Sequence, residues 1–299
     1  MGTSKISIIG SGVVGTATGR GFDKLGHEVI FYDVAKEKLR SLKNLGYSVA
    51  TTLEEAMSKT EISFICVNTP TSNGQQDLSQ VMSALYQLAN FLNGTESFHL
   101  IVFRSTMLPG TMRDLVVSYL DRHCSRKRGV DYQLCYNPEF LRQNSALDDF
   151  FSPDRVIIGE DRKGISEALV ALYRELTDRI IVTTFEAAEL IKYASNCFLA
   201  LKISFFNEIG MMCRSIGVDD KIVSLGVSLD KRIGKYGTEA GRPFDGMCLP
   251  KDTQALASYV KKLQIDPDLL QVVLDINKKL EDLTTTKQLV SGIRESLQM

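Results

Sequence analysis

The sequence has almost no net charge and no long apolar run, and each absence excludes a class of protein. The 299 residues carry a formal charge of −1, so no basic field favours binding to nucleic acid or to an anionic membrane surface. No apolar run reaches the roughly 18 residues that a membrane-spanning helix requires. Residues 1–5 lead directly into a strand-like run, without the charged and then apolar layout of a secretory signal.

The sequence also lacks paired cysteines. Its six cysteines are scattered along the chain, at a spacing that suits neither a zinc site nor a disulfide framework. Four of them lie inside apolar strand-like or helical runs, where core packing is the ordinary role. We therefore expect reduced cysteines, no metal and a cytoplasmic protein. Cys248 differs from the others because its neighbours are glycine, proline, lysine and aspartate.

The first part of the chain alternates strands and helices. A short β-branched run predicts a strand at 5–9, and further strands are predicted at 28–32, 62–67, 100–103, 132–136, 155–158 and 180–184. Helical segments lie between most of them, including one that ends near Leu25 and one over residues 36–45. This alternation predicts an α/β fold with a Rossmann-like, doubly wound and mostly parallel sheet, covered by helices on both faces.

From residue 186 onward the pattern is all helical. Residues 186–216 contain no proline and one glycine, and such a helix spans roughly 45 Å at 1.5 Å per residue. That length favours a helix that joins two lobes or forms a dimer contact. Further helices are predicted over 218–226, 253–262, 267–280 and 284–297, with a polar loop at 231–246. We place a domain boundary at residue 185, between an α/β domain (1–185) and a helical domain (186–299).

A glycine-rich turn follows the first predicted strand and opens the first predicted helix. Glycines in such a turn allow the backbone to approach a pyrophosphate closely at the helix N-terminus. Asp33 ends the second strand eighteen residues after Gly15, where a carboxylate binds a ribose 2′-hydroxyl and repels a 2′-phosphate. This context predicts NAD rather than NADP. The expected contacts are Gly10, Gly12, Val13, Val14, Gly15 and Asp33. Lys38 is a further candidate near the ribose, although a solvated surface lysine is the commoner role.

Lys192 and Asn196 lie four residues apart and share one face of the long helix. An ammonium in an apolar stretch costs free energy unless it is paired or hydrated. A lysine and an asparagine that line a cleft can stabilise the alkoxide formed when a hydride leaves an alcohol. The alternative is a lysine that reaches the surface beside a solvated asparagine, and the spacing alone leaves both open.

Cys248 precedes Pro250, Lys251 and Asp252 at the start of a predicted helix. A nearby cation and a helix N-terminus both favour the thiolate, which is the nucleophilic form of cysteine. Asp252 can orient a neighbour or accept a proton. The pattern predicts a reactive thiol, and an inert loop cysteine is the alternative.

Together these segments resemble the UDP-glucose and GDP-mannose dehydrogenase family over nearly the whole chain. The resemblance includes residues 67–71, 104–111 and 137–142, which are similar to the family's cofactor and substrate loops. It also includes Lys192 and Asn196 on the central helix and the cysteine motif at 248–252. Residues 152–159 look closer to the UDP-glucose branch than to the GDP-mannose branch.

The resemblance implies an enzyme that oxidises the primary alcohol of a nucleotide sugar to a carboxylate with two NAD, in polysaccharide biosynthesis. It implies a homodimer through the long helix. The catalytic residues it implies are Cys248, Lys192, Asn196, Asp252, Glu139 and Thr106. It adds cofactor contacts at Thr69, Thr106 and Lys251. It implies substrate contacts at Glu139, Phe140, Leu141, Lys192, Asn196, Arg232 and Gly246, with Arg232 supplied by the partner subunit. An exposed structural arginine is the alternative role for Arg232.

The resemblance also assigns a sequence of steps. Lys192, Asn196 and a water held with Asp252 manage the proton and oxyanion of the first oxidation. Cys248 then captures the aldehyde as a thiohemiacetal, which a second hydride transfer converts to a thioester. Glu139 activates the water that hydrolyses the thioester, and Thr106 helps to hold that water.

Three departures from the family pattern leave other functions open. Gln143 stands where the family usually has a second glutamate, and Asp245 lies in the usually glycine-rich approach to the cysteine. The nucleotide-binding domain that usually follows in the family is not expected within these 299 residues. One alternative is a single-step dehydrogenase of the 3-hydroxyacid type, which would need no cysteine. The other is an NAD-binding module without catalysis.

Overall fold

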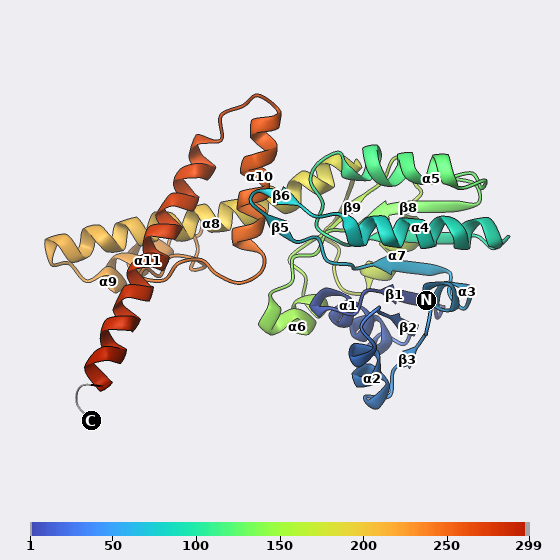
Figure 1. Cartoon of the computed structure of the whole chain (residues 1–299), viewed down its shortest axis with the longest axis horizontal. Helices are drawn as coiled ribbons and strands as arrows, with labels where there is room; N and C mark the ends of the chain where they lie inside the picture. Colours follow the sequence, from blue (N-terminus) through green and yellow to red (C-terminus); the bar gives the residue numbers. More distant parts are fainter. Residues whose placement is uncertain (1, 297–299) are drawn as a thin grey trace. The chain divides into compact units, whose positions relative to one another are not determined.

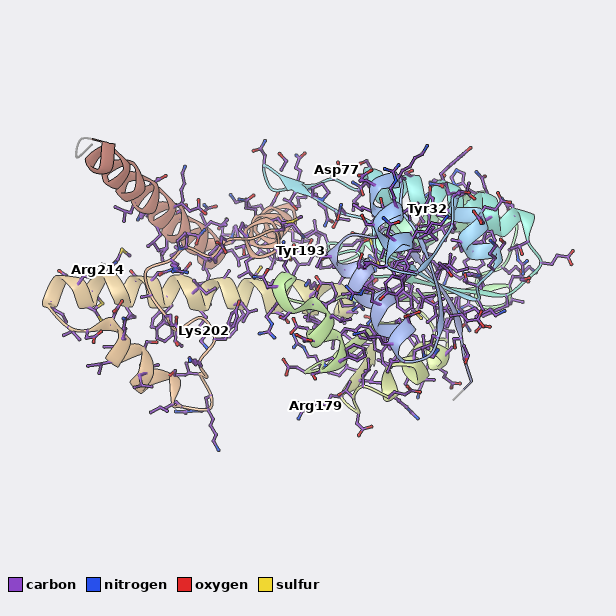
Figure 2. All side chains as sticks on the ribbon, turned by 90° about the horizontal axis from the view of Figure 1, so that it is seen from below. Tyr32, Asp77, Arg179, Tyr193, Lys202 and Arg214 are labelled. Carbon is purple, nitrogen blue, oxygen red and sulfur yellow. The ribbon has the colours of Figure 1, made fainter. Side chains whose placement is uncertain are left out.

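The computed structural model describes the backbone of residues 2–296 and the side chains of residues 2–283. The chain forms two compact units (Figure 1). The sheet unit comprises the residues up to Pro70 together with Asp77–Lys192, and the helical unit comprises Thr71–Gln76 and the residues from Tyr193 onward. Helix α8 (Phe185–Ile216) supplies residues to both units, and Tyr193 is marked on it in Figure 2. The boundary predicted at residue 185 stays a prediction.

The sheet unit confirms the Rossmann-like α/β fold. Its sheet has eight strands in the order β10-β9-β8-β7-β4-β1-β2-β3. The strands are β1 (Lys5–Ile9), β2 (Glu28–Tyr32), β3 (Ser48–Val49), β4 (Ile62–Ile65), β7 (His99–Phe103), β8 (Tyr132–Tyr136), β9 (Val156–Gly159) and β10 (Ile180–Thr183). All neighbouring strands pair in parallel except β8 and β9, which are antiparallel.

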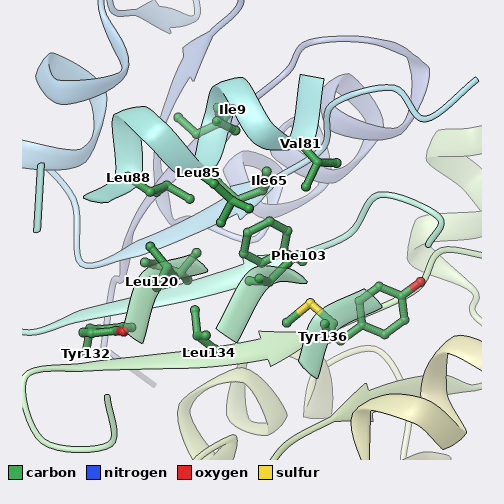
Figure 3. Packing of buried hydrophobic residues seen from close by; sticks show 14 of the residues in the cluster. Ile9, Ile65, Val81, Leu85, Leu88, Phe103, Leu120, Tyr132, Leu134 and Tyr136 are labelled. Carbon is green, nitrogen blue, oxygen red and sulfur yellow. The ribbon is translucent and has the colours of Figure 1, made fainter. Parts of the chain in front are cut away.

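Helices cover both faces of this sheet. Successive residues of each central strand point to opposite faces, so each strand contributes side chains to both cores. The helical segments are α1 (Val13–Lys24), α2 (Lys36–Asn44), α3 (Leu53–Ser58), α4 (Ser79–Gly94), η1 (Met112–Val117), α5 (Ser118–His123), η2 (Gln143–Ser145), α6 (Ala146–Phe151) and α7 (Glu167–Arg174). Ile9, Phe103 and Leu88 belong to the core on one face (Figure 3). Ile8 and Phe22 belong to the core on the other. The central strands are therefore buried on both sides, which explains their continuous apolar runs.

The helical unit contains the larger part of α8, α9 (Asp220–Ser228), α10 (Leu249–Lys262) and α11 (Asp268–Ser296). The two helices predicted over 267–280 and 284–297 are wrong in one respect, since the structure has a single helix, α11. The residues between them, Glu281–Leu283, contain neither proline nor glycine, so nothing interrupts the helix. Residue 297 lies outside the described residues. Helix α10 begins four residues earlier than predicted, with Pro250 in its first turn.

A short hairpin also belongs to the helical unit. Strands β5 (Thr71–Ser72) and β6 (Gln75–Gln76) are antiparallel and are joined by Asn73 and Gly74, both at positive φ. The Asn-Gly pair is a strong hairpin signal in the sequence, but this hairpin is not among the elements predicted above. A Cβ added at Gly74 would lie 3.0 Å from the Cβ of Ser258, so the hairpin packs closely against α10.

Buried asparagines and one lysine hold the long loop between α9 and α10. Asn207 accepts a hydrogen bond from the Gly241 amide (2.7 Å) and donates to the Arg242 carbonyl (2.7 Å). Asn277 binds the amide (2.7 Å) and the carbonyl (3.0 Å) of Phe244 in the same way. Lys202, marked in Figure 2, donates to the Ile233 carbonyl (2.5 Å). The loop that leads to Cys248 is therefore fixed from three helical positions. Within the part of the chain searched, no helix is long and apolar enough to cross a membrane.

Candidate active site

The turn after β1 requires glycine at two positions. Gly10 has φ +98°, and a Cβ there would lie 2.8 Å from the backbone of Cys66. A Cβ at Gly15 would lie 1.9 Å from the carbonyl oxygen of Gly10. Side chains cannot occupy these positions without moving the turn, so the tight connection from strand to helix is built into the sequence.

The N-terminus of α1 is open to a ligand. Gly12 is the N-cap, and no side chain caps the helix there. A Cβ at Gly12 would come no closer than 3.9 Å to Oδ1 of Asn68, and Val13 is exposed. Unbonded amides and the helix dipole favour an anion at such a terminus. The residues predicted to bind the pyrophosphate therefore fit that group.

Asp33 is buried and already bound on both carboxylate oxygens. Oδ2 accepts from the Ser11 amide (2.6 Å) and from Nζ of Lys38 (3.3 Å), and Oδ1 accepts from the Ala35 amide (2.8 Å). A carboxylate has about four acceptor positions, so about one remains for a ribose hydroxyl. Lys38 is bound to Asp33 rather than solvated alone. Ala35 is the N-cap of α2, and no side chain caps that helix.

Replacement of Asp33 by asparagine tests this arrangement. We expect Asp33→Asn to weaken NADH binding about tenfold or more, because a charge-assisted hydrogen bond contributes about 1.5–3 kcal/mol. Binding of NADPH should weaken less or improve, since the charge that repels a 2′-phosphate is removed. Fluorescence titration with both cofactors measures the ratio. Glu37→Gln, an exposed carboxylate on α2, is the control. An unchanged NADH-to-NADPH ratio in Asp33→Asn would contradict the assignment.

Thr69 and Thr106 lie together after the carboxyl ends of β4 and β7. Thr69 Oγ1 donates to the Thr106 carbonyl (2.6 Å), and Ser105 Oγ donates to the Val67 carbonyl (2.6 Å). Strands β4 and β7 are neighbours in the sheet. Ligands of open α/β sheets bind beyond these strand ends, so both threonines occupy the edge where a dinucleotide is expected.

Lys192 and Glu139 form a buried ion pair. Nζ of Lys192 lies 2.9 Å from Oε1 of Glu139 and 2.6 Å from its carbonyl oxygen, and the two residues are 2% and 5% exposed. Oε2 of Glu139 accepts from the Leu141 amide (2.6 Å). Burial raises the pKa of Glu139, but Lys192 and this amide outweigh it and leave the pKa below its ordinary value. Glu139 is therefore ionised at neutral pH, and Lys192 does not reach the surface as a solvated side chain.

Phe140 lies against two cations. The guanidinium carbon of Arg155 is 4.1 Å from the centre of the Phe140 ring, and Nζ of Lys192 is 5.3 Å from it. Cations at these distances are attracted by the ring electrons. The ring therefore keeps Arg155 beside the Glu139 loop.

A buried polar cluster that the sequence analysis missed supports the same loop. Arg104 donates to Oδ1 of Asn137 and to the hydroxyl of Tyr173 (3.1 Å), and Tyr173 donates to the same Oδ1 (2.7 Å). Asn137 Nδ2 donates to the Ile157 carbonyl (2.7 Å). Burial raises the pKa of Tyr173 to about 12, so its hydroxyl stays a donor. Arg104 and Asn137 lie in motifs that resemble the family, but Tyr173, on α7, gave no signal in the sequence.

The helical unit brings together the other catalytic candidates. Asn196 Nδ2 donates to Oδ2 of Asp252 (2.7 Å), and Nζ of Lys251 lies 2.5 Å from Oδ1. Asp252 is fully buried, and its amide donates to the Cys248 carbonyl (3.0 Å). Cys248 is the N-cap of α10 and is exposed. The three side chains Asn196, Lys251 and Asp252 thus meet in the first turn of the helix that carries the cysteine.

Cys248 is the one exposed cysteine of the six. Burial raises the pKa of Cys66, Cys135 and Cys197 to about 12, which makes them inert thiols. Cys124 is partly buried, and burial raises its pKa as well. Accessibility therefore singles out the cysteine that the motif singled out.

Two predicted substrate residues are not joined to this cluster by a contact in the described residues. The Arg232 side chain is 90% exposed and pairs with Asp230 at 2.6 Å. Gly246, at φ +78°, is exposed in the loop before Cys248. The departures Gln143 and Asp245 are both exposed.

Comparison with known proteins identifies the family. Residues 43–177 match the NAD binding domain of the UDP-glucose/GDP-mannose dehydrogenase family, and residues 186–279 match its central domain. The glycine turn lies before residue 43, so its assignment rests on the geometry above.

Similar proteins from three organisms agree with this match. A UDP-glucose 6-dehydrogenase of Rickettsia bellii is 36% identical over 94% of this chain and 68% of its own length. A GDP-mannose 6-dehydrogenase of Pseudomonas putida is 36% identical over 92% of this chain and 68% of its own. The solved UDP-glucose dehydrogenase of Pyrobaculum islandicum gives a TM-score of 0.85 at 36% identity, over 93% of this chain and 68% of that one. The chain therefore belongs to the UDP-glucose/GDP-mannose dehydrogenase family of NAD-dependent nucleotide-sugar dehydrogenases, and NAD is its cofactor.

Proposed function

We propose that this enzyme oxidises the primary alcohol of a nucleoside-diphosphate hexose to a carboxylate in two steps, with UDP-glucose as the substrate. The observation that carries the proposal is the exposed Cys248 at the N-terminus of α10, one turn before the buried Asp252. A single-step dehydrogenase of the 3-hydroxyacid type would need no such thiol. Bound NAD accepts the hydride in each oxidation.

In the first oxidation, Lys192 and Asn196 donate hydrogen bonds to the oxygen that becomes an alkoxide. Fixed donors at a developing charge are the largest single contribution to many enzymatic rates. The hydroxyl proton passes to a water held by Asn196 and Asp252. The hydrogen bond between these two side chains supports the assignment, because it fixes the amide group of Asn196.

In the second oxidation, the Cys248 thiolate attacks the aldehyde carbon, and a carbon–sulfur bond forms. Loss of a hydride from the resulting thiohemiacetal gives a thioester. Glu139 takes a proton from water as that water attacks the thioester carbon, and Thr106 holds the water. The carbon–sulfur bond then breaks, which restores the thiol and releases the carboxylate. The ionised state of Glu139 supports a role as base.

The choice of UDP-glucose rests on residues 152–159, whose pattern resembles that branch of the family. The relatives include enzymes named for both UDP-glucose and GDP-mannose, so the sugar is part of the proposal. A reduced Cys248 thiol requires reducing conditions, and we therefore propose a cytoplasmic enzyme. A role in polysaccharide biosynthesis is proposed from the family resemblance. Arg232 of a second subunit is the proposed contact to the sugar.

The number of NADH molecules formed per sugar tests the proposal. We incubate the protein with NAD and with UDP-glucose or GDP-mannose, and we measure NADH and the uronate product. Two NADH per sugar consumed supports the double oxidation, and the preferred sugar identifies the branch. One NADH per molecule with a 3-hydroxyacid substrate would support the single-step alternative. Binding of NAD without turnover of any nucleotide sugar would support the non-catalytic module.

The proposed homodimer rests on exposed apolar stripes in the helical unit. Phe198, Phe205 and Met212 recur every seven residues on α8, and each is more than half exposed. Ile222 and Leu225 are exposed three residues apart on α9. Contiguous apolar stripes of this kind mark protein interfaces, and a two-fold dimer buries the same surface on both copies.

A charge placed in each stripe should separate the subunits. We expect Phe205→Asp combined with Leu225→Asp to give a monomer in sedimentation at micromolar concentration, because unpaired carboxylates are costly in an apolar interface. The wild type should sediment as a dimer. Tyr86→Asp, an exposed aromatic on α4 of the sheet unit, is the control and should leave the mass unchanged. A monomeric wild type would contradict the proposal.

A further inference from the structure

Glu189 is a fully buried glutamate that takes part in none of the proposed reaction steps. It lies on α8 within the sheet unit, three residues before Lys192, and is 0% exposed. Oε2 accepts from the Gly110 amide (2.6 Å), and Oε1 accepts from the Met112 amide (2.8 Å). Met112 is the first residue of η1, and Gly110 lies just before its N-cap Thr111, so the Met112 amide has no partner within its own helix.

These two amides are the hydrogen-bond partners that hold the Glu189 carboxylate. Burial, with a smaller contribution from the charge of Glu186, raises its pKa to about 8, while the two amides and the charge of Arg113 act against that rise. A buried carboxylate is costly unless its hydrogen bonds are satisfied. Glu189 binds two backbone amides at once, which an apolar residue at the same position could not do.

A second contact joins the same two elements at the surface. Glu186, one turn earlier on α8, pairs with Arg113 at 2.6 Å; the Arg113 side chain is 60% exposed and that of Glu186 is 37% exposed. Exposed pairs of this kind contribute little to stability. The Glu186 pair therefore provides a matched control, with the same helix and the same partner segment but without burial.

Glu189 stands between two groups of active-site candidates. The segment that it binds follows directly from the loop that carries Thr106, whose carbonyl accepts from Thr69. One helical turn after Glu189, Lys192 holds Glu139. Residues three apart on a helix face the same side, so rotation or sliding of the first turns of α8 would displace Lys192.

We propose that Glu189 is a positioning residue, which ties the loop that carries Thr106 to the helix that carries Lys192 and so keeps both in register with Glu139. The proposal rests on the proposed function, since it assigns Lys192, Glu139 and Thr106 to the reaction. Glu189 itself touches neither substrate nor cofactor in this role. Its loss would leave NAD bound but the reacting groups misaligned, and a displacement of about 1 Å can lower a rate about a hundredfold.

Glu189→Gln is the test, because glutamine has the same shape but only one acceptor oxygen for the two amides. We expect kcat to fall on the order of tenfold to a hundredfold, with the Kd for NADH within about twofold of the wild type. Glu186→Gln should keep kcat within about twofold. If Glu189→Gln does not fold, Glu189→Asp keeps the carboxyl group on a shorter side chain and should show the same losses.

Amide hydrogen exchange provides a readout that needs no substrate. In Glu189→Gln, exchange at Gly110 and Met112 should accelerate. The Leu141 amide, which binds Glu139, should also exchange faster if the link extends to that loop. Faster exchange at all three amides together with a fall in kcat supports the proposal. Unchanged exchange at Leu141, or a kcat within twofold of the wild type, would overturn it and leave Glu189 as a local anchor. If the wild type turns over no nucleotide sugar but exchange at Leu141 is still faster in Glu189→Gln, the proposed function is overturned and the link between the two segments is supported.

Discussion

Replacement of Cys248 by alanine should abolish uronate formation while it leaves the protein folded. The side chain is exposed at the first position of α10, so its loss opens no cavity. Without the thiol, no thiohemiacetal forms, and the second hydride has no activated intermediate to leave. Loss of an enzymatic nucleophile lowers kcat by about 10³-fold to 10⁶-fold. We expect NADH formation to stop at no more than one per sugar, with the aldehyde as the product.

The control for this experiment is a second cysteine. Cys124→Ala removes a partly buried thiol from the sheet unit and should keep the wild-type rate. Iodoacetamide should label Cys248 first, because burial keeps the thiols of Cys66, Cys135 and Cys197 protonated. A Cys248→Ala protein that makes uronate at the normal rate would refute the thioester mechanism.

The fold was predictable wherever a local signal was strong. Strands β1, β2 and β8 match their predicted residues, because each is a short and mostly apolar run. Strand β3 has two residues, too few for any periodicity. Helix α11 was divided in two by the sequence analysis, although no helix breaker lies between its halves. The errors therefore fall at short elements and at boundaries.

The candidate site was predictable as a set of residues but not as a set of contacts. The sequence puts Lys192 and Asn196 on one face of a helix, and it cannot say what each of them binds. Lys192 binds Glu139 across 53 residues of sequence, and Asn196 binds Asp252 across 56. Sheet topology and helix packing bring these partners together, and neither is encoded in local spacing. Glu189 could have been noticed as a carboxylate in an apolar helical stretch, one turn before Lys192.

Removal of the Lys192 ammonium should destabilise the protein and also stop the reaction. Lys192→Met keeps most of the length of the side chain but leaves the Glu139 carboxylate buried without its cation. Breaking a buried ion pair in this way costs about 3–5 kcal/mol of unfolding free energy. Thermal and urea unfolding measure the loss, and kcat should fall about 10³-fold because the donor to the alkoxide is gone.

The pH dependence of that loss identifies its cause. In the wild type, the pKa of Glu139 is lower in the folded protein than in the unfolded chain, where it is 4.5. The ionised carboxylate therefore stabilises the fold above pH 4.5, and this stabilisation is lost as the pH falls through the folded pKa. In Lys192→Met, burial dominates and the folded pKa lies above 4.5. The carboxylate then destabilises the protein at neutral pH, and the difference from the wild type should shrink as the solution is acidified. A difference that is independent of pH would mean that lost packing, not charge, is responsible.

The double variant Lys192→Met with Glu139→Gln separates stability from catalysis. An amide at position 139 has no charge to bury, so most of the stability lost in Lys192→Met should return, as buried pairs replaced together are often neutral. Activity should not return, because the double variant has neither the donor for the first oxidation nor the base for the hydrolysis. If the double variant lost as much stability as the two single variants combined, the two side chains would not interact. Recovery of stability without activity is the expected result, since a pair kept for folding alone could be replaced without loss of function.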